Sequence, residues 1–171
     1  MKIYTKLGDY GQSELLGGMR LHKDADRFRA LGELDEVSAW LGMLKCKVSG
    51  DEKAFIEQIQ KDLIVLMSHC AALGGKEMDK YPFPAGLELE IEKRIDAIAG
   101  SWSGETCFDL PGVNEVSACA HIARTVVRRA ERALCTIGWE YPLSVDALAY
   151  INRLSDYLFV LSVREAGGEG K

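Results

Sequence analysis

The sequence lacks the features that mark a secreted, membrane-spanning or zinc-binding protein. Its 171 residues include five cysteines, an odd number with no CxxC pair, which argues against a disulfide framework and a zinc knuckle. The first residues lack the basic and apolar regions of a secretory signal, and no apolar run approaches the roughly 18 residues of a membrane span. We therefore expect a reduced, cytoplasmic protein with no membrane partner.

The sequence also lacks an excess of positive charge. It has 21 Lys and Arg residues against 26 Asp and Glu residues, which gives a net charge of −5 with His neutral. This balance argues against a nucleic-acid partner, because a protein that binds nucleic acid through its own field is usually basic. With 47% hydrophobic and 27% charged residues, the composition is that of a globular protein, and the length predicts a single domain over residues 1–171.

Three common cofactor and nucleotide motifs are absent as well. None of the three His residues has a Glu three positions earlier, so the Glu-x-x-His pairs of di-iron helix bundles are missing. The stretch Gly74-Gly75-Lys76 continues with Glu77 and lacks the Walker A spacing. No GxGxxG follows a strand, because the sequence shows no convincing strand. A nucleotide site in this chain therefore needs another kind of phosphate contact.

Hydrophobic periodicity instead predicts an all-α fold. Residues 1–22 are rich in glycine and have no helical period, so we expect an ordered loop there. Over residues 24–165, apolar residues recur at i, i+3, i+4 and i+7, with Gly and Pro at the breaks. This pattern predicts an up-and-down bundle of five helices, over residues 25–48, 52–73, 86–100, 114–137 and 143–165. Asn114 and Ser144 are the expected N-caps of the last two helices.

A line of charged residues runs along the helix predicted over 114–137. Arg124, Arg128 and Glu131 have i, i+4, i+7 spacing, which places them opposite the apolar face. The line is either a solvated face or a binding surface, because Arg forms planar forks that suit phosphate and carboxylate. The glycine-rich stretch 5–11 is likewise either a turn or an anion-binding nest of backbone N–H groups, with Lys23 near the next helix start.

Polar residues also interrupt the helix predicted over 143–165. Its apolar residues cover most of the circumference, yet Asn152, Arg153 and Asp156 lie within it. An unpaired buried polar group costs about 1–3 kcal/mol, so these residues need either partners on a neighbouring helix or a ligand. In the first helix, Asp35 facing an Arg of the fourth helix is the simplest way to pair both side chains.

Five motifs resemble the PduO-type ATP:cob(I)alamin adenosyltransferases. In chain order they are IYTKLGDYGQSELLGG (3–18), LHKDADRFRALGELDEVSAWLG (21–42), FDLPG (108–112), HIARTVVRRAER (121–132) and NRLSDYLF (152–159). The resemblance implies a five-helix bundle of the ferritin-like, cobalamin adenosyltransferase type that forms a homotrimer with active sites between subunits. It also implies transfer of the 5′-deoxyadenosyl group of ATP to the cobalt of a reduced corrinoid, with release of triphosphate.

The resemblance further implies an ATP site built from two subunits. Contacts to the phosphates are implied for Thr5, Lys6, Gly8, Asp9, Gly11 and Lys23. Contacts to the nucleotide from the adjoining subunit are implied for Arg128, Glu131 and Asn152. Mg²⁺ is expected to bridge phosphate oxygens, without a metal ligand that can be assigned to the protein.

A second group of residues is implied near the corrinoid. Arg124 is expected to pair with Asp35 across the subunit interface. Phe108 is expected to occupy the lower face of the cobalt and to exclude its axial ligand, which makes four-coordinate Co(II) easier to reduce. Together with Arg128, these three are the implied catalytic residues.

Leu7 departs from the family pattern, which usually has Thr or Lys at this position and so one more phosphate contact. This departure favours a second hypothesis, a noncatalytic nucleotide or corrinoid sensor or carrier. A third hypothesis is a structural helical module whose Arg face is solvated. If the chain is the enzyme, a reductase and an adenosylcobalamin-dependent enzyme are further partners.

Overall fold

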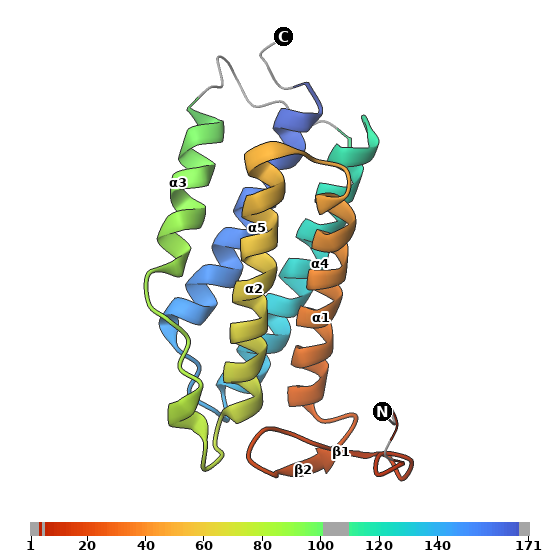
Figure 1. Ribbon diagram of the computed structural model, residues 1–171, viewed down its shortest axis with the longest axis vertical. Coiled ribbons are helices and arrows are strands. Elements are labelled where there is room, and N and C mark those ends of the chain that lie inside the picture. The colour runs from red at the N-terminus through yellow and green to blue at the C-terminus, as the bar shows by residue number, and fades with distance from the viewer. Residues whose placement is uncertain (1–3, 5, 101–109, 168–171) are drawn as a thin grey trace.

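The protein folds as a bundle of five antiparallel helices in a computed structural model (Figure 1). The structure describes residues 4, 6–100 and 110–167. The helices are α1 (Asp26–Lys45), α2 (Gly50–Ala72), α3 (Leu87–Ala99), α4 (Glu115–Gly138) and α5 (Val145–Glu165). A short 3-10 helix, η1 (Met78–Lys80), lies between α2 and α3. The predicted helices are confirmed, with their ends shifted by at most three residues.

The expected N-caps of α4 and α5 are both present. The backbone N–H of Ser117 donates to Asn114 Oδ1 at 2.8 Å, and that of Ala147 donates to Ser144 Oγ at 3.0 Å. Each cap satisfies one of the N–H groups that have no partner inside the first turn of a helix. The sequence therefore specifies where α4 and α5 begin. Residues of these two helices line the cavity described below.

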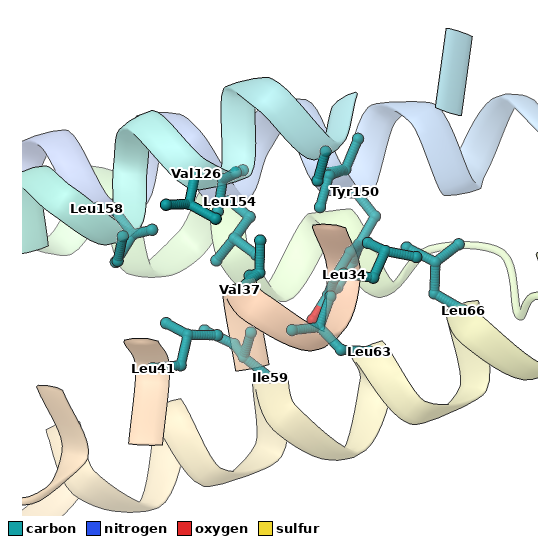
Figure 2. Packing of buried hydrophobic residues seen from close by; sticks show 14 of the residues in the cluster. Leu34, Val37, Leu41, Ile59, Leu63, Leu66, Val126, Tyr150, Leu154 and Leu158 are labelled. Atoms are coloured by element: carbon teal, nitrogen blue, oxygen red, sulfur yellow. The ribbon is translucent and has the colours of Figure 1, made fainter. Parts of the chain in front are cut away.

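Most of the core lies between four of the helices (Figure 2), and Ile91 and Ile98 of α3 extend it. α1 packs between α2 and α4, and α5 packs between α4 and α3. The labelled side chains point toward one another from α1, α2, α4 and α5, and they are Leu34, Val37, Leu41, Ile59, Leu63, Leu66, Val126, Tyr150, Leu154 and Leu158. Full burial of one such aliphatic side chain stabilises the fold by about 1.5–3 kcal/mol. This rigid core fixes the helix faces that carry the polar residues.

The expectation that the N-terminal segment contains no strand is wrong. β1 (Gln12–Glu14) and β2 (Arg20–His22) pair as an antiparallel hairpin in which Ser13 lies opposite Leu21. Strands of three residues are too short to show the alternation by which a strand is detected in a sequence. Leu15, 6% exposed, follows β1 and helps to anchor the hairpin.

The hairpin and the start of α4 lie at opposite ends of the bundle. In Figure 1 the hairpin is at the bottom, whereas α4 begins and α5 ends at the top. A helix of 24 residues such as α4 is about 36 Å long at 1.5 Å per residue. Within the part of the chain that the structure describes, no helix has the length and apolar character needed to cross a membrane.

Candidate active site

A cavity of about 350 Å³ lies between the first half of α4 and the second half of α5. The α4 wall consists of Ser117, His121, Arg124 and Arg128, which have i, i+4, i+7, i+11 spacing and share one helix face. The α5 wall has the same spacing and consists of Ser155, Phe159, Ser162 and Ala166, together with Asp156 and Val163. Leu110 and Pro111, which precede α4, complete the lining.

Three polar atoms on the α4 wall are buried and have no hydrogen-bond partner among the described residues. They are Ser117 Oγ, His121 Nδ1 and Arg124 Nε. On the opposite wall, the hydroxyls of Ser155 and Ser162 are satisfied, because each donates to a backbone carbonyl of α5. Each buried atom without a partner costs about 1–3 kcal/mol. A ligand with polar groups on the side facing α4 would recover this cost.

His121 is the titratable group in this wall whose pKa is displaced. Burial and the neighbouring guanidinium of Arg124 both hold the pKa of His121 below its usual range. The imidazole is therefore neutral at pH 7, when one ring nitrogen donates a hydrogen bond and the other accepts one. A neutral ring suits an uncharged polar ligand group such as an amide.

Ser117 and His121 are site residues that the sequence reasoning missed. Arg124 and Arg128 were singled out because charge is conspicuous on a helix face. Extending the same i, i+4, i+7 register toward the N-terminus leads from Arg128 through Arg124 to His121 and Ser117. The helical spacing therefore indicates Ser117 and His121 as members of the same face as Arg124 and Arg128.

The described residues of the predicted phosphate-binding set lie together beside the N-terminal hairpin, because the stretch 6–11 precedes β1 and Lys23 follows β2. Successive turns form where the Asp9 N–H donates to the Lys6 carbonyl and the Gly11 N–H donates to the Gly8 carbonyl, each at 3.3 Å. Lys6 has a φ of 61°, which is uncommon for a residue other than glycine. Lys6 and Asp9 are exposed, and Thr5 lies outside the described residues. The loop thus presents its polar groups to solvent.

Lys23 closes this loop from the far side of the hairpin. Its backbone N–H donates to the Gly11 carbonyl at 2.9 Å. Its ammonium lies so near Gly8 that a Cβ added at position 8 would be 3.1 Å from Nζ. From β2, which ends just before Lys23, Arg20 Nη2 donates to the Leu7 carbonyl at 3.1 Å. Lys23 and the loop are therefore held together, and the positive charge of Lys23 lies beside the turn at Gly8.

The polar residues of α5 have partners in neighbouring helices. Asn152 Nδ2 donates to Glu131 Oε1 at 2.9 Å, and Arg153 Nε donates to Glu92 Oε1 at 2.7 Å. Asp156 lies 3.8 Å from Arg153 and is exposed. Of the two alternatives left open by the sequence, partners on neighbouring helices account for Asn152 and Arg153. Phe108 lies outside the described residues.

Among the described residues of this chain, Asp35 does not pair with an Arg of α4, so its expected pairing with Arg124 across a subunit interface stays a prediction. The guanidinium of Arg129 instead contacts Glu33, at 2.5 Å, and Glu36. Glu33 and Glu36 are three residues apart and share the face of α1 that meets α4, whereas Asp35 is turned away from it. Asp35 is exposed in a shallow groove of about 510 Å³ between α1 and α2. Arg124 and Asp35 therefore line different surfaces of the chain.

Metal ligands do not gather within the described ranges 6–100 and 110–167. No cluster of three or more His, Cys, Asp or Glu side chains is placed there to hold a metal ion. Asp9 offers a carboxylate in the exposed loop. Oxygen of this kind suits Mg²⁺, which is usually bound by one or two carboxylates together with phosphates.

Comparison with known proteins gives a consistent set of relatives. The family model described as cobalamin adenosyltransferase matches residues 3–165. The corrinoid adenosyltransferase of Bacillus subtilis is 34% identical over 164 residues, which cover 93% of this chain and 83% of the relative. The human corrinoid adenosyltransferase MMAB is 34% identical over 176 residues, which cover 99% of this chain and 70% of the relative.

Solved structures give the same result. A phenylalanine-to-alanine variant of a PduO-type ATP:corrinoid adenosyltransferase from Lactobacillus reuteri, complexed with cobalamin and ATP, has a TM-score of 0.88 at 31% identity. The match covers 97% of this chain and 95% of that chain. An arginine-to-lysine variant from the same organism, complexed with ATP, has a TM-score of 0.87 at 31% identity and covers 98% and 95% of the two chains.

Proposed function

The chain belongs to the cobalamin adenosyltransferase family, and from that premise we propose how its residues transfer the 5′-deoxyadenosyl group of ATP to a reduced corrinoid. The observation that carries the proposal is the α4–α5 cavity with its three buried polar atoms that lack partners. A corrinoid is a large, mostly apolar ring with amide side chains. Its amides suit the unsatisfied groups of Ser117 and His121 on α4, and its ring suits the apolar residues of α5.

The transfer needs no nucleophile from the protein. Cobalt(I) supplies the electron pair for a new Co–C bond to the 5′ carbon of ATP. The C5′–O bond breaks, and its electron pair leaves with triphosphate. The chain must then hold the 5′ carbon close to the cobalt and stabilise the charge that develops on the leaving group.

We assign stabilisation of triphosphate to the N-terminal loop. Thr5, Lys6, Gly8, Asp9, Gly11 and Lys23 are the proposed phosphate contacts. The nearness of Lys23 Nζ to Gly8 supports this assignment, because it adds a cation beside backbone N–H groups. Mg²⁺ would enter with the phosphates and could take Asp9 as a ligand, where it would neutralise charge on the leaving group.

We further propose that the complete site forms between copies of the chain, in a homotrimer. The loop lies at the hairpin end of the bundle, whereas the cavity lies toward the end where α4 begins (Figure 1). Arg128, Glu131 and Asn152 therefore hold the ATP that sits on a neighbour's loop. The exposed Asp35 of one copy then pairs with the Arg124 guanidinium of another, whose Nε has no hydrogen-bond partner among the described residues.

Phe108 is proposed to cover the lower face of the cobalt. Chain connectivity supports this role, because Leu110 and Pro111 follow it closely and line the cavity. An apolar ring at that face excludes an axial ligand, and four-coordinate Co(II) is then easier to reduce. A reductase that delivers the electron and an enzyme that uses the product are the partners this chemistry requires, and a cytoplasmic location stays a prediction.

An absorbance assay tests the proposal. Purified protein, Mg-ATP and chemically reduced cob(I)alamin are mixed under anaerobic conditions and followed in the visible range. We expect the cob(I)alamin band to disappear and a light-sensitive adenosylcobalamin spectrum to grow over many turnovers. Binding of ATP without product would contradict the enzyme and favour a sensor or carrier. Binding of neither ligand would favour a structural module.

A further inference from the structure

We propose that Arg27 is a positioning residue for ATP, because it fixes the N-terminal hairpin, and with it the phosphate loop, against the helix bundle. The inference rests on the proposed function of that loop. Arg27 lies in the first turn of α1, four residues after Lys23, and its side chain points away from the loop into the protein. It is 3% exposed and has no carboxylate partner among the described residues.

The first anchor of Arg27 is the end of α2. Its Nη2 donates to the carbonyl oxygens of Cys70 and Ala71, each at 2.9 Å. These carbonyls belong to the last turn of α2, where backbone oxygens have no partner within the helix. A positive charge is also favoured there by the helix dipole. The guanidinium therefore has a fixed place at the lower end of α2.

The second anchor is the connection between α4 and α5. The guanidinium carbon of Arg27 lies 4.7 Å from the centre of the Tyr141 ring, in cation–π geometry. The ring also packs against Gly74, where an added Cβ would be 2.7 Å from Tyr141 Cε1. Only glycine at position 74 leaves room for the ring over the guanidinium. The end of α2 and the α4–α5 connection are thus joined through Arg27.

The third contact reaches the hairpin. Arg27 Nη1 lies 3.3 Å from the sulfur of Met19, in the turn between β1 and β2. The carbonyl of Met19 accepts from the Leu15 N–H at 2.8 Å, which closes that turn. The turn at Met19 joins β1 to β2, and β2 is followed by Lys23. The Lys23–Gly11 and Arg20–Leu7 hydrogen bonds then connect this strand to the phosphate loop. A shift of Met19 therefore moves the loop.

The chemistry of these contacts requires an arginine. Its planar fork reaches two carbonyls and a sulfur in different directions while its face stacks on a ring, which an ammonium cannot do. A buried charge without a carboxylate partner is expensive, and the Nε of Arg27 has no hydrogen-bond partner in the part of the chain that the structure describes. If position 27 had only to fill space in the core, an apolar side chain would do so at a lower cost in free energy of folding. The geometry therefore points to orientation of the hairpin.

The test compares Arg27→Met and Arg27→Lys with Arg94→Met. Arg94 is the matched control, because it also makes a hydrogen bond and stacks on an aromatic ring, Phe55, but on α3 and away from the hairpin. The measurements are the ATP Kd by calorimetry, the KM for cob(I)alamin, Tm and the oligomeric state. We expect Arg27→Met to raise the ATP Kd at least tenfold while the KM for cob(I)alamin changes less than twofold. Lysine should restore little of the loss.

Arg94→Met should lower Tm and leave the ATP Kd unchanged. If Arg27→Met does not fold, Tyr141→Leu replaces it, with Tyr141→Phe as the variant that keeps the ring and should bind ATP normally. An unchanged ATP Kd, or equal losses for both substrates, would overturn the positioning role. The proposed function fails separately if the wild-type chain binds ATP but forms no adenosylcobalamin, because the Kd comparison still tests Arg27. A wild-type chain that binds no ATP would overturn both.

Discussion

The α4–α5 cavity and the N-terminal loop offer polar groups to ligands in opposite ways. In the cavity, Ser117, His121 and Arg124 carry buried polar atoms that have no partner among residues 6–100 and 110–167, so the solvation of these atoms is already lost in the folded chain. In the loop, Lys6, Asp9 and Lys23 are exposed and solvated. The cavity therefore carries a cost in stability before any ligand binds, whereas the loop carries that cost only on binding.

This difference separates two kinds of effect. Substitutions in the cavity should change both stability and binding, because the same atoms determine both. Substitutions in the loop should change binding alone, because its side chains make few contacts in the free chain. Arg128 is the informative residue between these regions, since it lines the cavity but is exposed and is proposed to hold a neighbour's ATP.

The largest effect is expected for Arg128→Ala. Arg128 is proposed to hold the neighbour's ATP in position for attack by cobalt, so its loss should lower kcat by roughly 10²-fold. The side chain is exposed, so Tm and the oligomeric state should not change. The control is Arg132→Ala, one turn further along α4, which is also exposed and lies outside the cavity. Near-normal turnover in Arg128→Ala would contradict the assignment and would restrict the site to the buried wall.

Glu52→Gln tests what happens when a buried polar group does have partners. Glu52 on α2, 6% exposed, accepts hydrogen bonds from Tyr157, Arg94 and Arg164. An amide cannot neutralise the two guanidinium groups, so we expect a loss of roughly 2–3 kcal/mol in the free energy of unfolding at pH 7. Urea denaturation measures this loss. The exposed Glu57→Gln is the control and should leave stability unchanged.

The effect of Glu52→Gln on the free energy of unfolding should depend on pH. Burial alone would raise the pKa of Glu52, but hydrogen bonds from Tyr157, Arg94 and Arg164 outweigh it and hold the pKa below its usual range. The carboxylate therefore stabilises the fold above the pKa of the unfolded chain, and this contribution is lost as pH falls through the lower folded pKa. The difference between wild type and Glu52→Gln should shrink in acid. A constant difference down to the lowest pH would show that charge is not the cause.

Lys23→Ala should affect ATP binding without affecting stability. Loss of a charge-assisted contact to phosphate is expected to raise the ATP Kd by roughly tenfold to a hundredfold. Calorimetry measures the Kd, and a thermal scan without ligand measures Tm, which should stay the same. Lys80→Ala, another exposed lysine, is the control. A fall in Tm of the free chain would show that Lys23 belongs to the folded framework and would break the comparison between loop and cavity.

The sequence predicted the scaffold better than the site, for physical reasons. The helices repeat their apolar pattern over many residues, and the caps at Asn114 and Ser144 depend only on local geometry, so both could be predicted. The hairpin could not, because strands of three residues leave too short a pattern. The pairing of Asp35 with an Arg of α4 stays a prediction, because the charge of Asp35 is visible in the sequence but the surface that this side chain faces is not. The polar wall at Ser117 and His121 emerged only when the cavity fixed which face of α4 is enclosed.

The smallest effect, and the sharpest test of the cavity, is expected for Ser117→Ala. Ser117 is 1% exposed and its Oγ has no hydrogen-bond partner within the described ranges, so removing the hydroxyl should stabilise the chain by about 1 kcal/mol. For a chain of this size that corresponds to a rise in Tm of roughly 2–4 °C. Ser155→Ala, on the opposite wall, is the matched control, because its hydroxyl already donates to the Asn152 carbonyl and its removal should bring no gain. If the hydroxyl of Ser117 makes a hydrogen bond to the corrinoid, the more stable variant must also bind cob(I)alamin more weakly. A variant that is less stable, or that binds as tightly as the wild type, would mean that the free hydroxyl is not held for a ligand.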